Sequence, residues 1–172
     1  MKELILKLNP TRKIFEKVID LGCGTGLTGK ELRDISNNLT GIDLSSNMVA
    51  KTRELDVYDH FILGDIVDTL NSSTEKYDLF IALDVFIYVG ELTTVFKTVR
   101  KCCNKNAFFI FSVETQVEDG YSLLKSARYS HSEEYVLKTA SDGFKLIDSQ
   151  EVHLRKERDG WIDGKIFILQ AS

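Results

Sequence analysis

The feature that most constrains this chain is a run of alternate glycines directly after a short apolar stretch. Residues 17–21 (KVIDL) predict a buried strand, and Gly22, Gly24 and Gly26 follow it at once. Because glycine has no Cβ, the backbone can turn tightly there and a ligand can approach it closely. A helix expected over residues 25–35 would point its N-terminal N–H groups at the same space. The sequence therefore predicts a strand, a ligand-binding turn and a helix in succession.

The rest of the chain alternates in the same way. Apolar runs predict strands at residues 39–44, 57–63, 77–83 and 107–113, with amphipathic helices beginning at Ser45 and Leu92. A capping box at residues 130–133 makes Ser130 the expected N-cap of a helix that reaches about Ser141. Two strands, 144–154 and 161–170, flank a charged turn, RKERDG. The pattern predicts one α/β domain over residues 1–172, an open sheet with helices on both faces and a terminal antiparallel hairpin.

A carboxylate is expected at the end of each of four successive strands, and ligands of such sheets bind at that edge. Asp43, 21 residues after Gly22, can accept both hydroxyls of a ribose. Asp65 can contact the edge of an adenine, and Asp20 suits a ligand that carries an ammonium group. Asp84 follows the fourth strand. Taken singly, Asp43, Asp65 and Asp84 could each be a helix N-cap, so their coincidence is the stronger signal.

Composition excludes several classes of function. The 172 residues carry 22 basic and 26 acidic side chains, a net charge of −4, which disfavours a nucleic-acid partner and favours a small molecule or a protein. Three cysteines, with Cys102 and Cys103 adjacent, predict reduced thiols and a cytoplasmic location. No apolar run approaches the roughly 20 residues of a membrane span, and no Cys/His pair has zinc spacing.

These segments resemble a known family. The runs VIDLGCGTG, GIDLS, Gly64-Asp65 and YDLFIALDVFIYVG are similar to successive motifs of class I S-adenosylmethionine-dependent methyltransferases. The segments LDVFIYVGEL, FFIFSVE, GYSLLKSARYSHSEEYV and VHLRKERDGWIDGKIFIL resemble the methyltransferase-like proteins that are attached to tetratricopeptide repeats. The resemblance covers nearly the whole chain. It implies a Rossmann-like sheet of seven strands in the order 3-2-1-4-5-7-6, with strand seven antiparallel.

The resemblance also implies a binding site for S-adenosyl-L-methionine. Gly22, Gly24 and Gly26 would surround its methionine part near Asp20, with Cys23 as a small filler between the glycines. Asp43 would accept the ribose hydroxyls. The remaining implied contacts are made by Leu44, Met48, Gly64, Asp65 and Ile66 around the adenine, and by Leu83 and Asp84 beside the acceptor.

The acceptor side is predicted from polar and aromatic residues outside the glycine run. His131 or Asp84 could act as a base, and Arg128 and Tyr129 could hold the acceptor. Tyr88 could form a wall of the acceptor pocket, or pack in the core. The alternative for His131 is a solvent-exposed residue in the first turn of a helix. Residues 155–158 are expected in a solvated hairpin turn rather than in acceptor recognition.

Two departures from the family bear on partners. Only 17 residues precede the apolar run of the first predicted strand, whereas relatives usually have additional N-terminal helices. No tetratricopeptide repeat is present either. Acceptor capture would then fall to residues 114–131 or to a partner chain that covers the N-terminal side. The first hypothesis, implied by the resemblance, is methyl transfer from S-adenosyl-L-methionine to a small-molecule or protein acceptor. A non-catalytic accessory subunit that binds the cofactor is the second hypothesis. An NAD-dependent reductase is the third, because Gly24, Gly26 and Gly29 also match the dinucleotide fingerprint.

Overall fold

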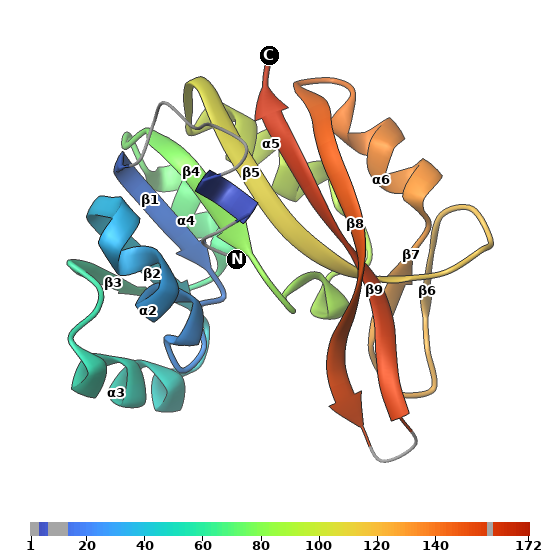
Figure 1. The fold of residues 1–172 in the computed structure, drawn as a ribbon, viewed down its shortest axis with the longest axis horizontal. Helices are drawn as coiled ribbons and strands as arrows, with labels where there is room; N and C mark the ends of the chain where they lie inside the picture. Colours follow the sequence, from blue (N-terminus) through green and yellow to red (C-terminus); the bar gives the residue numbers. More distant parts are fainter. Residues whose placement is uncertain (1–3, 7–13, 158–159) are drawn as a thin grey trace.

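The computed structural model describes residues 4–6, 14–157 and 160–172, and its strands join in one mixed sheet with helices on both faces (Figure 1). The strands are β1 (Phe15–Leu21), β2 (Ser36–Asp43), β3 (His60–Leu63), β4 (Tyr77–Ala82), β5 (Cys103–Thr115), β6 (Tyr121–Leu123), β7 (Tyr129–His131), β8 (Phe144–Glu157) and β9 (Gly160–Ala171). The helices are α2 (Leu27–Leu32), α3 (Ser46–Leu55), α4 (Ile66–Ser72), α5 (Thr93–Lys101) and α6 (Glu133–Ala140), with 3-10 turns η1 (Arg33–Ile35) and η2 (Phe86–Tyr88).

The sheet is mostly parallel, as predicted, but it has nine strands in place of seven and its order differs in detail from the predicted one. Its order is β3-β2-β1-β4-β5-β7-β6, and β9 also pairs antiparallel with β5 while β8 pairs with β9. The seven long strands thus run β3-β2-β1-β4-β5-β9-β8, with β1 to β5 parallel. The two additional strands, β6 and β7, form a short hairpin beside the end of β5. They lie in the polar stretch after residue 114, where no strand was predicted.

Alternating side chains divide the core into two layers. Along β5, Phe109 and Phe111 pack on the face covered by α4, α5 and α6, and Phe108 and Ile110 pack on the face covered by α2. This alternation follows from the two-residue period of a strand, and it needs apolar residues at every position because both faces are covered. The layers hold the carboxyl ends of the parallel strands at one edge. No helix among the described residues is long and apolar enough to span a membrane.

Several predicted boundaries differ from the structure, and two of them affect candidate site residues. The N-cap of α6 is Ser132, whose hydroxyl accepts a hydrogen bond from the Tyr135 N–H at 3.0 Å, so the helix begins two residues later than Ser130 predicted. Arg155 and Lys156 belong to β8 and pair with Ile162 and Trp161 of β9, so they lie in a strand rather than in the charged turn. The predicted turn residue Asp159 lies outside the described residues.

Candidate functional site

The carboxyl ends of β1, β2, β3 and β4 meet at one edge of the sheet. The register places Asp20 of β1 beside Gly41 of β2 and Ile81 of β4, and Asp43 at the end of β2 beside Leu63 of β3. This edge brings the glycine run, Asp43, Asp65 and Asp84 to the same end of the parallel strands, as the sequence predicted.

The glycine run forms an open turn between β1 and α2. Gly22, Gly24 and Gly26 have φ values of 69°, 51° and 82°, in the left-handed region that favours glycine. A Cβ on Gly22 would lie 2.6 Å from a Val85 methyl carbon, so this glycine lets the chain after β4 pack closely. A Cβ on Gly24 would lie 4.0 Å from the nearest protein atom. The space above Gly24 is therefore open to a ligand.

Asp43 holds this turn in place. Its two carboxylate oxygens accept hydrogen bonds from the N–H groups of Gly24 and Ser45, each at 2.8 Å. A carboxylate has about four acceptor positions, so these two bonds leave capacity for the hydroxyls of a ligand. The Thr52 hydroxyl donates a hydrogen bond to the Gly24 carbonyl at 2.6 Å, so both the N–H and the carbonyl of Gly24 are bonded. The half-buried Asp43 side chain is thus fixed and still able to accept.

Apolar side chains flank the Asp43 carboxylate. Leu44 follows β2 directly and is 74% exposed, and Met48, in the first turn of α3, is half-buried. Exposed leucines are common singly, but here Leu63 of the neighbouring β3 is also exposed. The arrangement can accept a flat apolar group next to a ribose.

Asp20 lies beneath the glycine turn rather than along its open side. Its side chain is 1% exposed and accepts a hydrogen bond from the Tyr58 hydroxyl at 2.6 Å. Burial raises the pKa of Asp20 to about 7, the Tyr58 hydrogen bond opposes this shift, and the charge of Asp43 adds to it. In this structure the carboxyl group therefore supports the turn from below.

Tyr58 is a residue of the site that the sequence analysis missed. A Cβ on Gly29 would lie 2.4 Å from its ring, and a Cβ on Gly41 would lie 3.1 Å from it. Both glycines are therefore needed for the ring to reach Asp20. The only signal in the sequence is the absence of a side chain at Gly29 and Gly41. Two glycines do not by themselves indicate which residue packs against them.

Cys23 fills space between the glycines, as predicted. Its thiol is buried, and burial raises its pKa to about 12, with the nearby Asp20 and Asp43 charges adding to the shift. A Cβ on Gly41 would lie 3.0 Å from its sulfur. The thiol stays protonated at neutral pH and has a packing role.

Asp65 acts as the N-cap of α4. One of its oxygens accepts from the N–H groups of Val67 and Asp68, at 2.8 and 3.1 Å. The Asp65 side chain is exposed at the sheet edge, while Ile66 packs against the core. Gly64 donates its N–H to the Asp43 carbonyl at 3.0 Å. The cap therefore uses one oxygen and leaves the other for a ligand.

Asp84 stands at the end of β4, after the half-buried Leu83. Its backbone is left-handed, with φ 56°, and its N–H donates to the Ser112 hydroxyl at 2.9 Å. Its Oδ1 accepts from one nitrogen of Arg155 at 2.9 Å, and the other fork nitrogen of Arg155 donates to Glu114 at 2.7 Å. Arg155 and Glu114 are two further residues that the sequence analysis missed, because Arg155 was expected in a turn.

His131 is buried inside the sheet layer. It is 0% exposed, and its Nε2 lies 3.0 Å from both the Val89 and the Gly90 carbonyl oxygens, so Nε2 carries the proton and donates. Burial lowers the pKa of His131. Its Nδ1 is buried without a hydrogen-bond partner among the described residues. The expectation of an exposed first-turn residue is wrong, and the buried position does not suit a base that meets an acceptor.

The other predicted acceptor residues lie around His131. Tyr88 is 68% exposed, on η2. Tyr129 is half-buried, and its ring packs where a Cβ on Gly90 would lie, 2.7 Å from it. The Arg128 carbonyl accepts from Leu124 at 2.8 Å. Of these, Tyr88 is the side chain that is open to solvent next to the end of β4.

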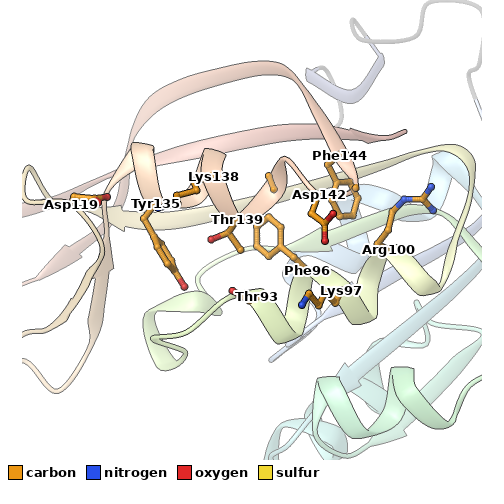
Figure 2. A pocket seen from close by; sticks show the side chains of 12 residues that line it. Thr93, Phe96, Lys97, Arg100, Asp119, Tyr135, Lys138, Thr139, Asp142 and Phe144 are labelled. Atoms are coloured by element: carbon orange, nitrogen blue, oxygen red, sulfur yellow. The ribbon is translucent and has the colours of Figure 1, made fainter.

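The two largest of three cavities among the described residues lie away from the glycine turn. One, of about 560 Å³, lies between α5 and α6, where Figure 2 shows Phe96 and Lys97 from α5 facing Tyr135 and Thr139 from α6. The other, of about 810 Å³, is lined by residues near the end of β5 and by the β8–β9 hairpin. Neither is lined by a residue of the glycine turn. The open space above Gly24 thus lies outside both of these cavities.

The residues at the edge fit the cofactor implied by the sequence resemblance. The open space above Gly24 admits a ligand backbone, Asp43 has acceptor capacity for ribose hydroxyls, and Leu44 with Met48 offers an apolar side. The N–H groups of the turn and of the helix that follows also favour an anionic group such as a carboxylate.

Comparison with known proteins agrees with the geometry. The sequence model of the methyltransferase domain family matches residues 19–111. The ubiquinone biosynthesis O-methyltransferase of Hydrogenovibrio crunogenus is 26% identical over 132 residues, which cover 68% of this chain and 54% of that protein. The malonyl-[acyl-carrier protein] O-methyltransferase of Enterobacter lignolyticus is 34% identical over 70 residues, 41% of this chain and 27% of that protein. The chain thus spans about half or less of these relatives.

Solved structures share the fold. An S-adenosylmethionine-dependent methyltransferase from Clostridium acetobutylicum aligns with a TM-score of 0.75 and 17% identity, covering 98% of this chain and 89% of that one. The N-methyltransferase NodS from Bradyrhizobium japonicum, in complex with S-adenosyl-L-homocysteine, aligns with a TM-score of 0.75 and 14% identity, covering 99% and 85%.

Proposed function

The chain belongs to the methyltransferase domain family, and from this premise we propose that it transfers the methyl group of S-adenosyl-L-methionine to a small-molecule acceptor. The proposal rests above all on the glycine turn, whose three left-handed residues leave open space above Gly24 while Asp43 fixes the turn from the side. A turn that is open and yet held by a carboxylate is what close approach of a ribose-bearing ligand requires.

Each part of the cofactor has a matching group at the edge. Asp43 accepts the ribose hydroxyls, and Leu44 and Met48 pack beside the adenine. Asp65 accepts from the adenine amino group with the oxygen that does not cap α4, next to Gly64 and Ile66. Gly22, Gly24 and Gly26 surround the methionine part. Asp20 lies beneath this turn and supports it, with its carboxylate accepting a hydrogen bond from the Tyr58 hydroxyl.

The acceptor side uses fewer groups. Bound S-adenosylmethionine supplies a methyl group whose bond to sulfur breaks as a lone pair of the acceptor forms the new bond, leaving S-adenosylhomocysteine. Asp84, 48% exposed at the end of β4, takes the proton that the acceptor loses and passes it to water. Tyr88 provides an exposed aromatic wall beside it. Holding donor and acceptor in line supplies much of the rate in such a reaction.

Binding of S-adenosylhomocysteine, measured by calorimetry, tests the proposal. The wild-type protein is expected to bind it, Asp43→Ala to weaken binding at least about tenfold, and the matched Asp142→Ala, an exposed carboxylate between α6 and β8, to change it less than about twofold. Circular dichroism checks that the variants fold. No binding by the wild type, or equal effects of the two substitutions, would overturn the site, as would NADH binding with enhanced fluorescence.

We also propose the narrower assignment to methyltransferase-like proteins associated with tetratricopeptide repeats. The segment GYSLLKSARYSHSEEYV, on which that resemblance partly rests, folds into β6, β7 and the first turn of α6. A partner chain over the N-terminal side would cover the exposed Leu27. Three unpaired, buried cysteines agree with the proposed cytoplasmic location. Tight cofactor binding without turnover on any acceptor would support an accessory subunit instead.

A further inference from the structure

Arg155 connects three separate parts of the chain at the acceptor side. It projects from β8, and the two nitrogens of its fork donate to Asp84, after β4, and to Glu114, on β5. The side chains of Arg155 and Glu114 are 16% and 11% exposed, whereas that of Asp84 is 48% exposed. One end of the group is therefore anchored in the protein and the other end reaches the open edge.

The largely buried Arg155–Glu114 pair determines the orientation of the exposed Asp84 carboxylate. The Asp84 backbone is held in the left-handed region by its N–H bond to Ser112, and its Oδ1 is held by Arg155. The planar guanidinium can bond both carboxylates at fixed angles, which the single ammonium of a lysine cannot do. With Oδ1 held by Arg155, the second oxygen of the 48% exposed Asp84 side chain has capacity to accept a hydrogen bond from an acceptor molecule.

The charges of the group bear on which acceptors it admits. One guanidinium between two carboxylates leaves a net charge of −1, and the exposed member is a carboxylate. A carboxylate accepts hydrogen bonds and repels anions, so it favours a group that donates a proton and disfavours a second carboxylate or a phosphate. The exposed ring of Tyr88 on η2 is suited to an aromatic acceptor.

We propose that Arg155 is a positioning residue that holds the Asp84 carboxylate toward the acceptor, and that this carboxylate selects hydroxyl or amine acceptors over carboxylates and phosphates. The inference rests on the proposed methyl transfer and adds to it an acceptor class and a residue from the opposite end of the chain. Arg155 bonds to the two carboxylates of the acceptor side, whereas the glycine turn is held by Asp43, so the effect of Arg155 on cofactor binding is expected to be small.

The first test compares Arg155→Gln and Arg155→Lys with Lys156→Gln, which removes a positive charge from the next, exposed position of β8. All three are expected to bind S-adenosylhomocysteine within about twofold of wild type. With catechol as acceptor, Arg155→Gln is expected to lower kcat at least about tenfold, Arg155→Lys to recover part of it, and Lys156→Gln to leave it unchanged. Equal kcat in Arg155→Gln and wild type would overturn the positioning role.

A second readout needs no turnover. In the complex with S-adenosylhomocysteine, the backbone amide resonance of Asp84 is expected to move in Arg155→Gln and in Arg155→Lys and to stay in place in Lys156→Gln. An unmoved Asp84 resonance in both Arg155 variants would overturn the inference. Wild-type protein that does not bind S-adenosylhomocysteine would instead overturn the proposed function, so the two failures are distinguishable.

The acceptor class is tested with probes of one size and different charge. Catechol, benzylamine and benzoate are titrated into the wild-type complex with S-adenosylhomocysteine, and binding is followed by NMR. Catechol or benzylamine is expected to bind at least about tenfold more tightly than benzoate, a difference that Asp84→Asn reduces. Benzoate binding as tightly as the other two, or failure of both catechol and benzylamine to bind, would overturn the acceptor class.

Discussion

The cofactor side and the acceptor side of this edge are built by different means. The cofactor side uses backbone: three left-handed glycines, their N–H groups, and an Asp43 carboxylate whose partners are main-chain N–H groups. The acceptor side uses side chains that meet across the fold, with Arg155 bonded to Asp84 and Glu114 although 71 and 41 residues separate them in sequence.

The difference indicates which part of the site is general and which is specific. A backbone turn binds what every member of a family shares, because it does not depend on which side chains lie around it. The side chains contributed by β5, β8 and the end of β4 can be substituted independently of one another. We therefore expect them to determine the specificity for the acceptor. We therefore expect substitutions on the cofactor side to change cofactor affinity, and those on the acceptor side to leave it nearly unchanged.

The largest expected effect lies beneath the cofactor side, at Asp20. Because burial raises its pKa to about 7 from 3.8, the folded state keeps a proton that the unfolded chain loses, and stability falls as pH rises between these values. At pH 8 the loss is up to about 4 kcal/mol. Asp20→Asn removes the titrating group, and its amide oxygen can still accept from Tyr58. We expect it to abolish this part of the pH dependence.

Urea denaturation at pH 5 and pH 8 measures this effect. The wild type is expected to lose more stability between the two pH values than Asp20→Asn, and Asp142→Asn, an exposed carboxylate, is expected to follow the wild type. Parallel behaviour of wild type and Asp20→Asn would contradict a raised pKa beneath the turn and would remove this distinction between the two sides.

The second prediction tests the open space above the turn. Gly24→Ala places a methyl group where no protein atom lies within 4 Å apart from the Gly22 carbonyl at that distance, so the chain can accept it sterically. The methyl would occupy the space of the ligand, and affinity for S-adenosylhomocysteine is expected to fall about 10- to 100-fold, or about 1.4 to 2.7 kcal/mol.

The matched control for Gly24→Ala is Gly120→Ala. Gly120 also has a positive φ, 95°, and a Cβ there would meet nothing within 4 Å. Both substitutions have the cost of a left-handed alanine, roughly 1–2 kcal/mol of stability. If calorimetry gives the same affinity for the two variants, the ligand does not lie above Gly24.

The smallest effect on cofactor affinity is expected on the acceptor side, at His131. His131→Phe keeps a ring beside Tyr135 but removes the donor to the Val89 and Gly90 carbonyls, at a cost of about 1–3 kcal/mol of stability. Affinity for S-adenosylhomocysteine is expected to stay within about twofold, since the change lies outside the cofactor side. Thermal melting and calorimetry measure the two quantities.

The pH dependence of His131 has the opposite sign to that of Asp20. Burial lowers its pKa below 6.5, so the stability contributed by the neutral ring is present above that pH and decreases as pH falls. His131→Phe is expected to lose this acid sensitivity. A variant as stable as wild type that has lost methyl transfer would instead identify His131 as a residue that acts in the reaction.

The two sides also differ in how far sequence predicted them. The turn at Gly22–Gly26 and Asp43 lie within one strand–helix–strand unit, so short-range spacing was enough to place them together. The open α/β sheet and the antiparallel terminal hairpin were predicted from the alternation of apolar runs for the same reason. These features depend on periodicity and turn chemistry, which sequence displays directly.

The errors have one physical cause, which is pairing between distant segments. His131 is buried because the three-residue strand β7 pairs with the end of β5, and so short a strand has no detectable period. Arg155 is in a strand because β9 continues the ladder to Gly160. Tyr58 reaches Asp20 through the space of two glycines, and nothing local in the sequence specifies that contact.

The central claim is that the cofactor lies on the open side of the glycine turn, against Asp43. A crystal structure of the protein with S-adenosylhomocysteine tests it most directly. The account predicts ribose hydroxyls within hydrogen-bond distance of the Asp43 carboxylate and the adenine beside Leu44. Ligand density in the cavity between α5 and α6, with the turn closed by side chains of this chain, would contradict it.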